Sequence, residues 1–220
     1  MPVDPGPLPI VVYGAGGHAK VVAQTLARSA RWRLAGFIDD LRPERRGEPF
    51  AGASVLGGAG ALDALRRDGV GHAIVAFGHN EARQRVAGQL ATLGFRLPTI
   101  IDVHAIVADD ASFGDGCYLA EGAVVHSGSR VGAHTIVNTG AVVEHDVAVG
   151  EAVHLGPRVC LAGHVQVGTR AWIGMGALVR DRVHVGADAV VGMGAVVLRD
   201  VPDGWVAYGA PARAVHPVKP

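Results

Sequence analysis

The tripeptide Glu144-His145-Asp146 combines the residue types that proton transfer requires. An imidazole titrates closest to neutral pH, so His145 is a candidate general base. A neighbouring carboxylate would orient the ring and stabilise its charged form, and we assign this role to Asp146, whereas Glu144 is equally consistent with a surface position. Two other roles stay open for His145: it orients or holds a substrate, or it is a polar residue on an inert surface.

A second group of residues has the spacing of a phosphate-binding turn. The run from Gly14 to Ala19 has the pattern G-x-G-x-x-A, and backbone N–H groups at such a helix start hold a pyrophosphate. His18 would meet a sugar or phosphate there, or only cap the turn. The acidic pair Asp39-Asp40 follows about twenty residues later, as in dinucleotide-binding folds. A nucleotide sugar also carries a pyrophosphate, and no second nucleotide-binding half follows, so a nicotinamide enzyme is not favoured.

The elements that must position this turn alternate between strands and helices. Apolar runs at 10–13, 34–38 and 72–77 predict strands, and 81–93 has helical spacing. This alternation predicts a small parallel α/β sheet. Ligands of open α/β sheets bind at the carboxyl ends of the strands. Three loops lie at that edge: 14–18, 39–40 and 78–81.

The element that must position His145 is a hexapeptide repeat. Every sixth residue from Val107 to Val197 is large and apolar, sixteen times without an insertion, and the residue four places later is small or β-branched. A period of six fits neither a helix nor an ordinary strand and is the signature of a parallel β-helix. Three hexapeptides close one triangular coil, and about five coils stack. A β-sandwich would instead need turn signals about every 8–12 residues.

This period converts residue numbers into positions in space. Residues eighteen apart should stack on successive coils, so we expect Ser127, His145 and Gly163 in one column, and Asp146 below His164.

Composition excludes several classes of protein. The 220 residues carry 20 basic and 20 acidic side chains with no basic run, and 5% are aromatic, so a nucleic-acid groove is not expected. No uncharged apolar stretch is long enough to span a membrane, and residues 1–9 are proline-rich without a basic segment, so neither a spanning helix nor a signal peptide is expected. We expect a cytoplasmic protein, with Cys117 and Cys160 as reduced packing residues.

Several motifs together resemble a known family of bacterial sugar acyltransferases. They are the Gly-Ala-Gly-Gly-His-Ala-Lys turn, Phe37-Ile38-Asp39-Asp40, Phe77-Gly78-His79-Asn80-Glu81-x-Arg83, Pro98-Thr99-Ile100-Ile101-Asp102, Asn138-Thr139 before Val143-Glu144-His145-Asp146, and Gly209-x-Pro211-Ala212. Nearly the whole chain resembles the sugar O-acyl and N-acetyltransferases of the sialic-acid O-acetyltransferase type. Hexapeptides alone also occur in serine acetyltransferases, sugar-nucleotide pyrophosphorylases and γ-class carbonic anhydrases, whereas the N-terminal unit joined to the Asn-Thr and Glu-His motifs is more specific.

The resemblance implies an architecture and an assembly. It predicts an α/β, Rossmann-like nucleotide-sugar-binding domain at 1–100, a left-handed parallel β-helix at 101–201 and a C-terminal tail at 202–220. It also implies a homotrimer with active sites between subunits, acetyl-CoA as co-substrate and no metal. The most similar members acetylate the 4-amino group of a nucleotide-linked 4-amino-4,6-dideoxy sugar for lipopolysaccharide or other surface glycans. GDP-perosamine is favoured, with UDP- and dTDP-linked sugars open.

The resemblance also implies roles for individual residues. His145 would be catalytic with support from Asp146, where the family usually has glutamate. The residues expected at acetyl-CoA are His154, Gly163, Met175 and Met193. Those expected at the nucleotide sugar are Gly16, Gly17, His18, Asp39, Asp40, Gly78 and Arg83.

Three alternatives remain at the level of sequence. A sugar O-acetyltransferase would use the same scaffold and a similar base. A γ-class carbonic anhydrase would use three histidines as zinc ligands. A noncatalytic binding solenoid would need no polar cluster. The histidines available for zinc are His126, His134, His145, His154 and His164.

Overall fold

The computed structural model describes residues 6–218. Residues 1–5 and 219–220, which belong to the proline-rich start and to the end of the predicted tail, lie outside the described residues. The chain forms two compact units, Met1–Val103 and His104–Pro220. The sequence predicts the boundary at residue 100.

The first unit is a five-stranded sheet flanked by helices, with strand order β3-β4-β2-β1-β5. All neighbours are parallel except β3 and β4. Its strands are β1 (Leu8–Tyr13), β2 (Trp32–Ile38), β3 (Pro49–Phe50), β4 (Ala53–Gly57) and β5 (His72–Val75), followed by the short β6 (Ile100–Ile101). Its helices are α1 (Gly17–Arg28), α2 (Leu62–Arg67) and α3 (Asn80–Thr92), with 3-10 turns η1 (Pro43–Arg45) and η2 (Ala59–Ala61).

Burial explains why β1 is central in this sheet. Ile10, Val11 and Val12 are fully buried, because β1 pairs with β2 on one side and β5 on the other. A buried parallel strand is expected to be apolar at successive positions. The helix α1 follows directly and buries Ala19, Val22, Ala23 and Leu26.

The elements between β2 and β5 were not predicted from the sequence. Strand β4 has the sequence ASVLG and α2 has only six residues, so neither shows a clear periodicity. The strand predicted at 72–77 is shorter in the structure and ends at Val75, and the helix predicted from residue 81 begins at Asn80. The three strands predicted from apolar runs all exist.

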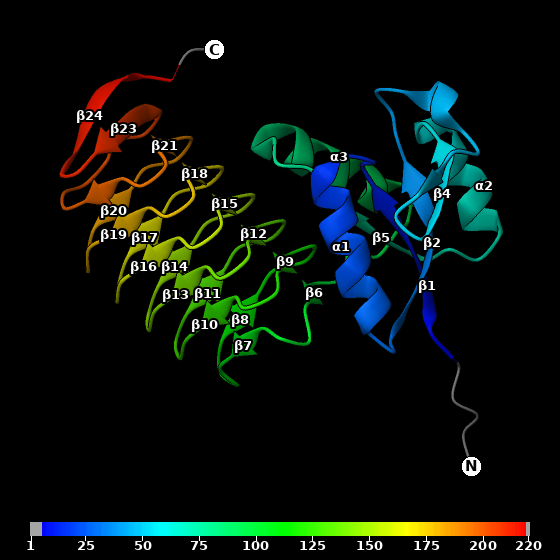
Figure 1. Cartoon of the computed structure of the whole chain (residues 1–220), viewed down its shortest axis with the longest axis horizontal. Helices are drawn as coiled ribbons and strands as arrows, with labels where there is room; N and C mark the ends of the chain where they lie inside the picture. The colour runs from blue at the N-terminus through cyan, green and yellow to red at the C-terminus, as the bar shows by residue number, and fades with distance from the viewer. Residues whose placement is uncertain (1–5, 219–220) are drawn as a thin grey trace. The chain divides into compact units, whose positions relative to one another are not determined.

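The second unit is a solenoid of stacked coils, which runs from green to red in Figure 1. Its first sheet contains β7 (Ile106–Val107), β10 (Val124–Val125), β13 (Val142–Val143), β16 (Cys160–Leu161), β19 (Leu178–Val179) and β22 (Val196–Val197). Its second sheet contains β8 (Ser112–Phe113), β11 (Arg130–Val131), β14 (Ala148–Val149), β17 (Gln166–Val167) and β20 (His184–Val185). Its third sheet contains β9 (Tyr118–Leu119), β12 (Ile136–Val137), β15 (His154–Leu155), β18 (Trp172–Ile173) and β21 (Val190–Val191).

The predicted register is confirmed throughout these sheets. Val124 pairs with Val142, and Val142 pairs with Cys160, so each residue lies beside the residue eighteen places later. The large inward residues fill the axis, and Leu155 and Leu161 are fully buried. Stability therefore accumulates coil by coil along the solenoid.

The outward faces of the first and second sheets differ in chemistry. The second sheet presents mainly polar or small side chains: Ser112, Arg130, Ala148, Gln166 and His184. The first sheet presents only apolar side chains, which we call the apolar column: Ile106, Val124, Val142, Cys160, Leu178 and Val196.

The predicted tail contains two further strands. Strand β23 (Trp205–Gly209) pairs in parallel with β21, and β24 (Ala212–Pro217) pairs antiparallel with β23. This hairpin continues the third sheet beyond the last coil. Covering the end of a solenoid in this way protects an edge that would otherwise be open for pairing.

Two smaller expectations concern cysteines and membranes. Both cysteines are free thiols, with Cys117 buried and Cys160 partly buried, as predicted. None of the helices in residues 6–218 is long and apolar enough to cross a bilayer.

Candidate functional site

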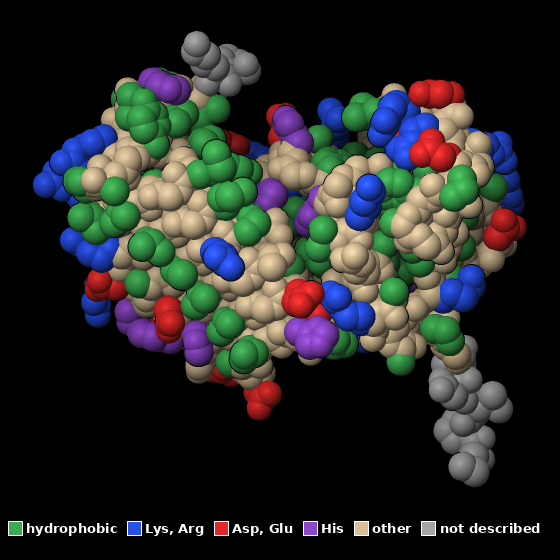
Figure 2. All heavy atoms as spheres, in the orientation of Figure 1, with side chains coloured by type: hydrophobic (Ala, Val, Ile, Leu, Met, Phe, Trp, Pro, Cys, Tyr) green, Lys and Arg blue, Asp and Glu red, His purple; other side chains and the backbone are tan. Residues whose placement is uncertain are grey.

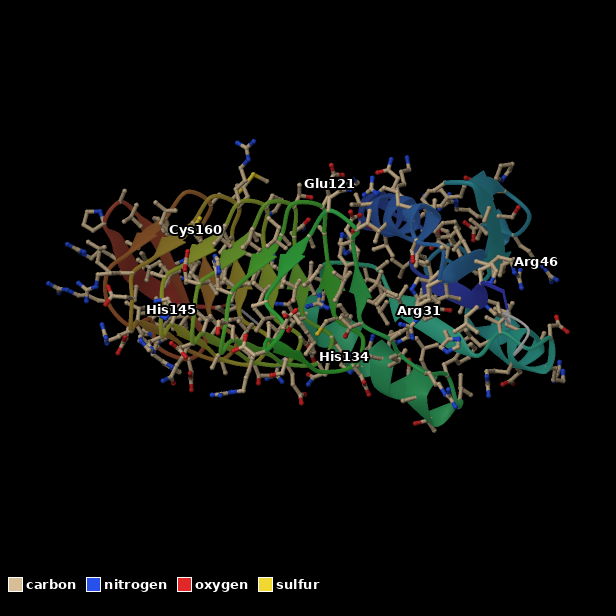
Figure 3. All side chains as sticks on the ribbon, turned by 90° about the horizontal axis from the view of Figure 1, so that it is seen from below. Arg31, Arg46, Glu121, His134, His145 and Cys160 are labelled. Carbon is tan, nitrogen blue, oxygen red and sulfur yellow. The ribbon has the colours of Figure 1, made fainter. Side chains whose placement is uncertain are left out.

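The predicted base lies in a turn at one edge of the solenoid. The turns that follow β10, β13 and β16 stack on one another, and we call residues 126–128, 144–146 and 162–164 the histidine corner. Histidine side chains gather along the lower edge of the solenoid in Figure 2, over these turns. Figure 3 shows His145 on this edge. The backbone of each turn is tied to the next, because Asp146 N–H donates to Ser127 O (3.0 Å) and His164 N–H donates to His145 O (3.1 Å).

His145 and Asp146 form the expected pair. Nδ1 of His145 lies 2.9 Å from Oδ2 of Asp146. A carboxylate only accepts hydrogen bonds, so Nδ1 carries the proton and Nε2 keeps a lone pair. The hydrogen bond from His145 lowers the pKa of Asp146 below its usual value, and the nearby His164 adds to this effect. Asp146 is therefore ionised at neutral pH and holds His145 in the tautomer that accepts a proton at Nε2.

Two glycines create the space that this pair occupies. A Cβ at Gly163 would lie 2.7 Å from both Cε1 and Nε2 of His145, and a Cβ at Gly128 would lie 2.5 Å from Oδ1 of Asp146. Nε2 of His145 therefore lies directly against the backbone of Gly163. Among the described residues, the N–H of Gly163 donates no hydrogen bond. The corner therefore combines a nitrogen lone pair on His145 with the backbone of Gly163, whose N–H is not used within the described residues.

Glu144 points to a different partner. Its Oε1 is 3.9 Å from Nε2 of His126, and its side chain lines a groove over the apolar column. The side chain facing His145 is that of Asp146, so the second carboxylate of the tripeptide takes no part in orienting this ring.

The residues predicted to contact acetyl-CoA do not all lie at this corner. Gly163 does, because it is eighteen residues from His145. Met175 and Met193 lie in turns that follow the third sheet, where Gly194 N–H donates to Met175 O (2.9 Å). We call residues 138–140, 156–158, 174–176 and 192–194 the methionine corner. Met175 and Met193 are 52% and 67% exposed, which is unusual for methionine and leaves an apolar stripe open to a ligand or partner.

His154 lies on the third sheet beside the methionine corner. Its Nε2 is 3.2 Å from Nδ2 of Asn138, and its ring meets Trp172 edge to face at 6.3 Å. The side-chain Oδ1 of Asn138 accepts the backbone N–H of Thr139 at 2.9 Å. The Asn-Thr motif therefore holds the His154 ring rather than the His145 ring. Of the predicted cofactor residues, only Gly163 lies at the corner of the predicted base, whereas His154, Met175 and Met193 lie at or beside the methionine corner.

A groove of about 380 Å³ lies between these corners, over the first sheet. Its floor is the apolar column, and Leu178, 47% exposed, lies in it. The charged residues at its rim are Glu144 and Arg180. This groove was not predicted from the sequence, although the outward residues of the apolar column follow from the six-residue repeat.

In the first unit, a pocket of about 460 Å³ lies at the carboxyl edge of the sheet. It contains several of the predicted residues: Gly16, Asp39 and Asp40, with Gly14 and Ala15 of the glycine turn. Gly14 has φ +126°, and a Cβ there would lie 2.8 Å from Ala76 O, so only glycine allows the chain to turn here.

The two carboxylates of the acidic pair have different surroundings. Asp39 is 6% exposed, and its Oδ2 accepts from Arg45 at 2.7 Å. Arg45 also donates to Ala15 O at 3.1 Å, so Asp39 braces the glycine turn through an arginine. Asp40 is exposed, and its Oδ1 accepts the N–H of Ala59 at 2.9 Å. Asp40 is therefore the carboxylate available to a ligand.

Three further residues line this pocket: Tyr13, His79 and Arg85. His79 belongs to the loop 78–81 that was predicted at this edge, with its role left open, whereas Tyr13 and Arg85 were not predicted as site residues. Burial and the interaction with Asp40 raise the pKa of Tyr13 to about 12, so its hydroxyl is a donor at neutral pH. His79 caps α3, and its Nδ1 accepts the N–H of Ala82 at 3.3 Å. Tyr13 is the last residue of a predicted strand, and Arg85 lies near the start of a predicted helix. Both residues could have been predicted at this pocket, because ligands bind where strands end and helices begin.

Arg83, which was expected at the nucleotide sugar, is buried in the structure. Its side chain is 1% exposed and donates to Phe77 O (3.2 Å) and Asn80 Oδ1 (2.9 Å). It braces the loop between β5 and α3 from within. Gly17 and Gly78 are exposed and His18 is half-buried, all in loops at the carboxyl edge or at the start of α1.

The chain resembles several solved acetyltransferases over almost its full length. PerB from Caulobacter crescentus, solved in complex with CoA and GDP-perosamine, is 40% identical, with a TM-score of 0.89 over 94% of this chain and 96% of that chain. The acetyltransferase domain of PglB from Neisseria gonorrhoeae FA1090, solved with acetyl coenzyme A, is 36% identical, with a TM-score of 0.89 over 96% of this chain and 100% of that chain. The chain belongs to the hexapeptide-repeat sugar N-acetyltransferases.

Other comparisons agree with this family. WeeI from Acinetobacter baumannii AYE is 27% identical, with a TM-score of 0.82 over 94% of this chain and 100% of that chain. Residues 9–90 match the PglD N-terminal domain. No curated protein matches the chain. The predicted fold, a Rossmann-like unit followed by a left-handed parallel β-helix, is confirmed for this acyltransferase, and so is the predicted enzyme class.

Proposed function

We propose that this enzyme transfers the acetyl group of acetyl-CoA to the 4-amino group of a nucleotide-linked 4-amino-4,6-dideoxy sugar, with GDP-perosamine as the favoured acceptor. The observation that carries the proposal is the His145–Asp146 pair, whose proton-accepting nitrogen lies against Gly163. The likeness to PerB, a structure that contains both CoA and GDP-perosamine, supports the choice of substrates.

The geometry supports direct transfer. The sugar amine attacks the thioester carbonyl, the new C–N bond forms, and the C–S bond breaks to release CoA. Nε2 of His145 takes the proton that the nitrogen sheds, and Asp146 stabilises the resulting imidazolium. This proton then goes to the departing sulfur. The N–H of Gly163, which donates no hydrogen bond among the described residues, would donate to the oxyanion.

The pocket of the first unit suits the nucleotide. The glycine turn at the start of α1 would bind the pyrophosphate through Gly16 and Gly17 with His18 near the sugar. Asp40 and Arg85 would contact the nucleoside, and Gly78 lies in a neighbouring loop. We assign Asp39 and Arg83 to bracing these loops, because both are buried and paired within the protein.

The acetyl-CoA site would be built from two copies of the chain. His145 and Gly163 lie on one corner, while His154, Met175 and Met193 lie on or beside another. A second copy that packs on the apolar column would bring its own corner to the first. The groove over this column is apolar, and Ile106, Leu178 and Leu198 are 66%, 47% and 38% exposed. Desolvating such a face favours association. We propose a homotrimer, as the family resemblance implies.

This reaction fits the synthesis of lipopolysaccharide or another surface glycan. Both substrates are soluble cytoplasmic metabolites, and we place the enzyme in the cytoplasm on that ground. Neither a metal ion nor a nucleic acid has a role in the proposed chemistry.

Product analysis tests the proposal. The purified enzyme is incubated with acetyl-CoA and with GDP-, UDP- or dTDP-linked 4-amino-4,6-dideoxy sugars, and free CoA thiol and product mass are recorded. We expect one acetyl group per sugar, the highest kcat/KM with the GDP sugar, and a product that survives mild base because it is an amide. A base-labile ester would establish the alternative of O-acetylation. A thermal-shift series with GDP, UDP and dTDP ranks the nucleotides independently, because a ligand raises stability by RT ln(1 + [L]/Kd).

A further inference from the structure

The histidine corner carries a second histidine that the proposed reaction does not use. His164 lies one coil beyond Asp146, and its ring meets the ring of His145 edge to face at 5.2 Å. Nδ1 of His164 is 3.9 Å from Oδ2 of Asp146, the same oxygen that lies 2.9 Å from Nδ1 of His145. One carboxylate oxygen is therefore shared between two imidazoles.

The spacing of these three groups approaches that of a metal site. Ligand atoms of His145, Asp146 and His164 all lie within 4.8 Å of one another. Nitrogen and oxygen ligands lie about 2.0–2.2 Å from zinc, so neighbouring atoms of a tetrahedral site are about 3.4 Å apart. Oδ2 of Asp146 lies 2.9 Å from Nδ1 of His145 and 3.9 Å from Nδ1 of His164, and these two separations bracket that value. Small rotations of exposed side chains are enough to equalise them, and water completes the fourth position.

The backbone holds these side chains on one edge. Asp146 and His164 both have left-handed backbones, with φ 59° and 61°. Their turns are fixed to the neighbouring coils by the backbone hydrogen bonds described above. Asp146 supplies the carboxylate oxygen that lies nearest to both imidazoles.

We propose that His145, Asp146 and His164 bind one Zn²⁺, or another divalent transition metal that prefers nitrogen ligands, and that the bound ion inhibits acetyl transfer. Two imidazoles and one carboxylate are a common ligand set for zinc, whereas Mg²⁺ prefers oxygen ligands and retains its water. The site is inhibitory rather than catalytic. An ion on Nδ1 of His145 leaves the proton on Nε2, so that Nε2 donates a hydrogen bond and no longer accepts a proton. This inhibition rests on the proposed role of His145, whereas binding does not.

His164→Asn tests the site with little risk to the fold. Asparagine tolerates the left-handed conformation that His164 adopts. His134→Asn is the matched control, because His134 has the same left-handed backbone, φ 59°, in a turn that follows the second sheet rather than the first. Figure 3 shows His134 and His145 at separate places on the solenoid.

Binding is measured first, without substrates, by competition between the protein and a coloured zinc chelator. We expect one Zn²⁺ per chain for the wild type and for H134N, and an affinity at least about tenfold lower for H164N, since even the loss of an outer-shell partner weakens metal sites by that much. Equal affinity in the wild type and H164N overturns the site. Mg²⁺ at the same concentration should not compete, and competition by Mg²⁺ also overturns the proposal.

Inhibition is then measured as the initial loss of thioester absorbance, because released CoA itself binds zinc. Each variant is compared with its own rate in EDTA. We expect Zn²⁺ to inhibit the wild type and H134N reversibly, with half-inhibition in H164N at a concentration at least about tenfold higher. If H164N loses zinc binding but is inhibited by zinc as strongly as the wild type, inhibition does not arise from an ion bound at His145, Asp146 and His164, and the proposal is overturned. If the wild type transfers no acetyl group in EDTA, this result contradicts the proposed function instead. The binding assay then still shows whether the three residues bind zinc.

Discussion

The histidine corner of the solenoid and the pocket of the first unit position their functional side chains in different ways. The corner places exposed groups by register: His145 and Gly163 meet because eighteen residues separate them, and every coil is hydrogen-bonded to the next. The pocket gathers groups from the ends of several elements, with Asp39 buried against Arg45 and Tyr13 beside Asp40. A rigid repeat suits chemistry that needs fixed geometry, whereas loops suit recognition of one particular substrate. We therefore expect the corner to control kcat and the pocket to control KM.

Disrupting the apolar column should have the largest effect. Leu178→Lys places a charge in the middle of the face on which a second copy would pack. If the active site is shared between chains, L178K separates the chains and lowers kcat/KM by more than about 10³-fold. The reason is that the general base and the bound acetyl-CoA are no longer held next to each other. Light scattering gives the mass of the assembly and CoA release gives the rate.

Gln166→Lys on the outward face of the second sheet is the control, and it should keep both the assembly and the activity. A fully active single-chain L178K would refute the shared site.

Gly163→Ala tests the geometry of the corner. The added Cβ would lie 2.7 Å from His145, and the ring can move away because it is exposed. Stability should change little, but a displaced base should lower kcat by about 10²-fold with KM for the sugar nearly unchanged. Gly88→Ala in α3, where a Cβ meets nothing within 4 Å, serves as the control. A kcat for G163A within twofold of the wild type would show that the ring position is not critical.

Asp40→Asn tests the pocket. Asp40 is the exposed carboxylate of the acidic pair, and we expect its loss to raise KM for the nucleotide sugar about tenfold while kcat stays unchanged, because hydrogen bonds to charged groups contribute about 1.5–3 kcal/mol. Asp63→Asn, an exposed change in α2, should leave both constants as they are. A fall in kcat with constant KM would reverse the division of labour between the two regions.

The titration of Tyr13 is the smallest of these effects. Burial and Asp40 raise its pKa from 10.0 to about 12. The folded protein therefore favours the neutral phenol, and this contribution to stability is complete below pH 10 and is lost as pH rises toward 12. The difference in absorbance near 295 nm between wild type and Tyr13→Phe isolates this group. A titration near pH 10 would mean that the hydroxyl is exposed and not held by Asp40.

The solenoid was predictable from sequence to the level of single residues. A period of six with no insertion fixes which side chains point inward and which stack, so the column of Ser127, His145 and Gly163 followed from arithmetic alone. The meeting of His164 with Asp146 followed in the same way. The prediction of a C-terminal tail did not include strands, because Trp205–Gly209 continues the third sheet without the hexapeptide pattern.

The pocket was predictable only in outline. The glycine turn and the three strands were recognised, but β4 and α2 were too short to show a period. The contrast between Asp39 and Asp40 depends on Arg45, which reaches back from η1, and the burial of Arg83 depends on its contact with Phe77. Such tertiary pairings have no local sequence signal. The difference between amine and hydroxyl acceptors is likewise a property of the bound substrate rather than of any motif.

The most direct test of the account is the kcat of His145→Asn with saturating acetyl-CoA and saturating GDP-linked 4-amino-4,6-dideoxy sugar. Asparagine keeps a polar side chain at the corner but cannot accept the proton from the amine. If His145 is the general base, kcat falls by about 10²- to 10⁴-fold while KM for the sugar changes little. A kcat within about tenfold of the wild type would contradict general-base catalysis by His145 and leave this residue as a group that only orients the substrate.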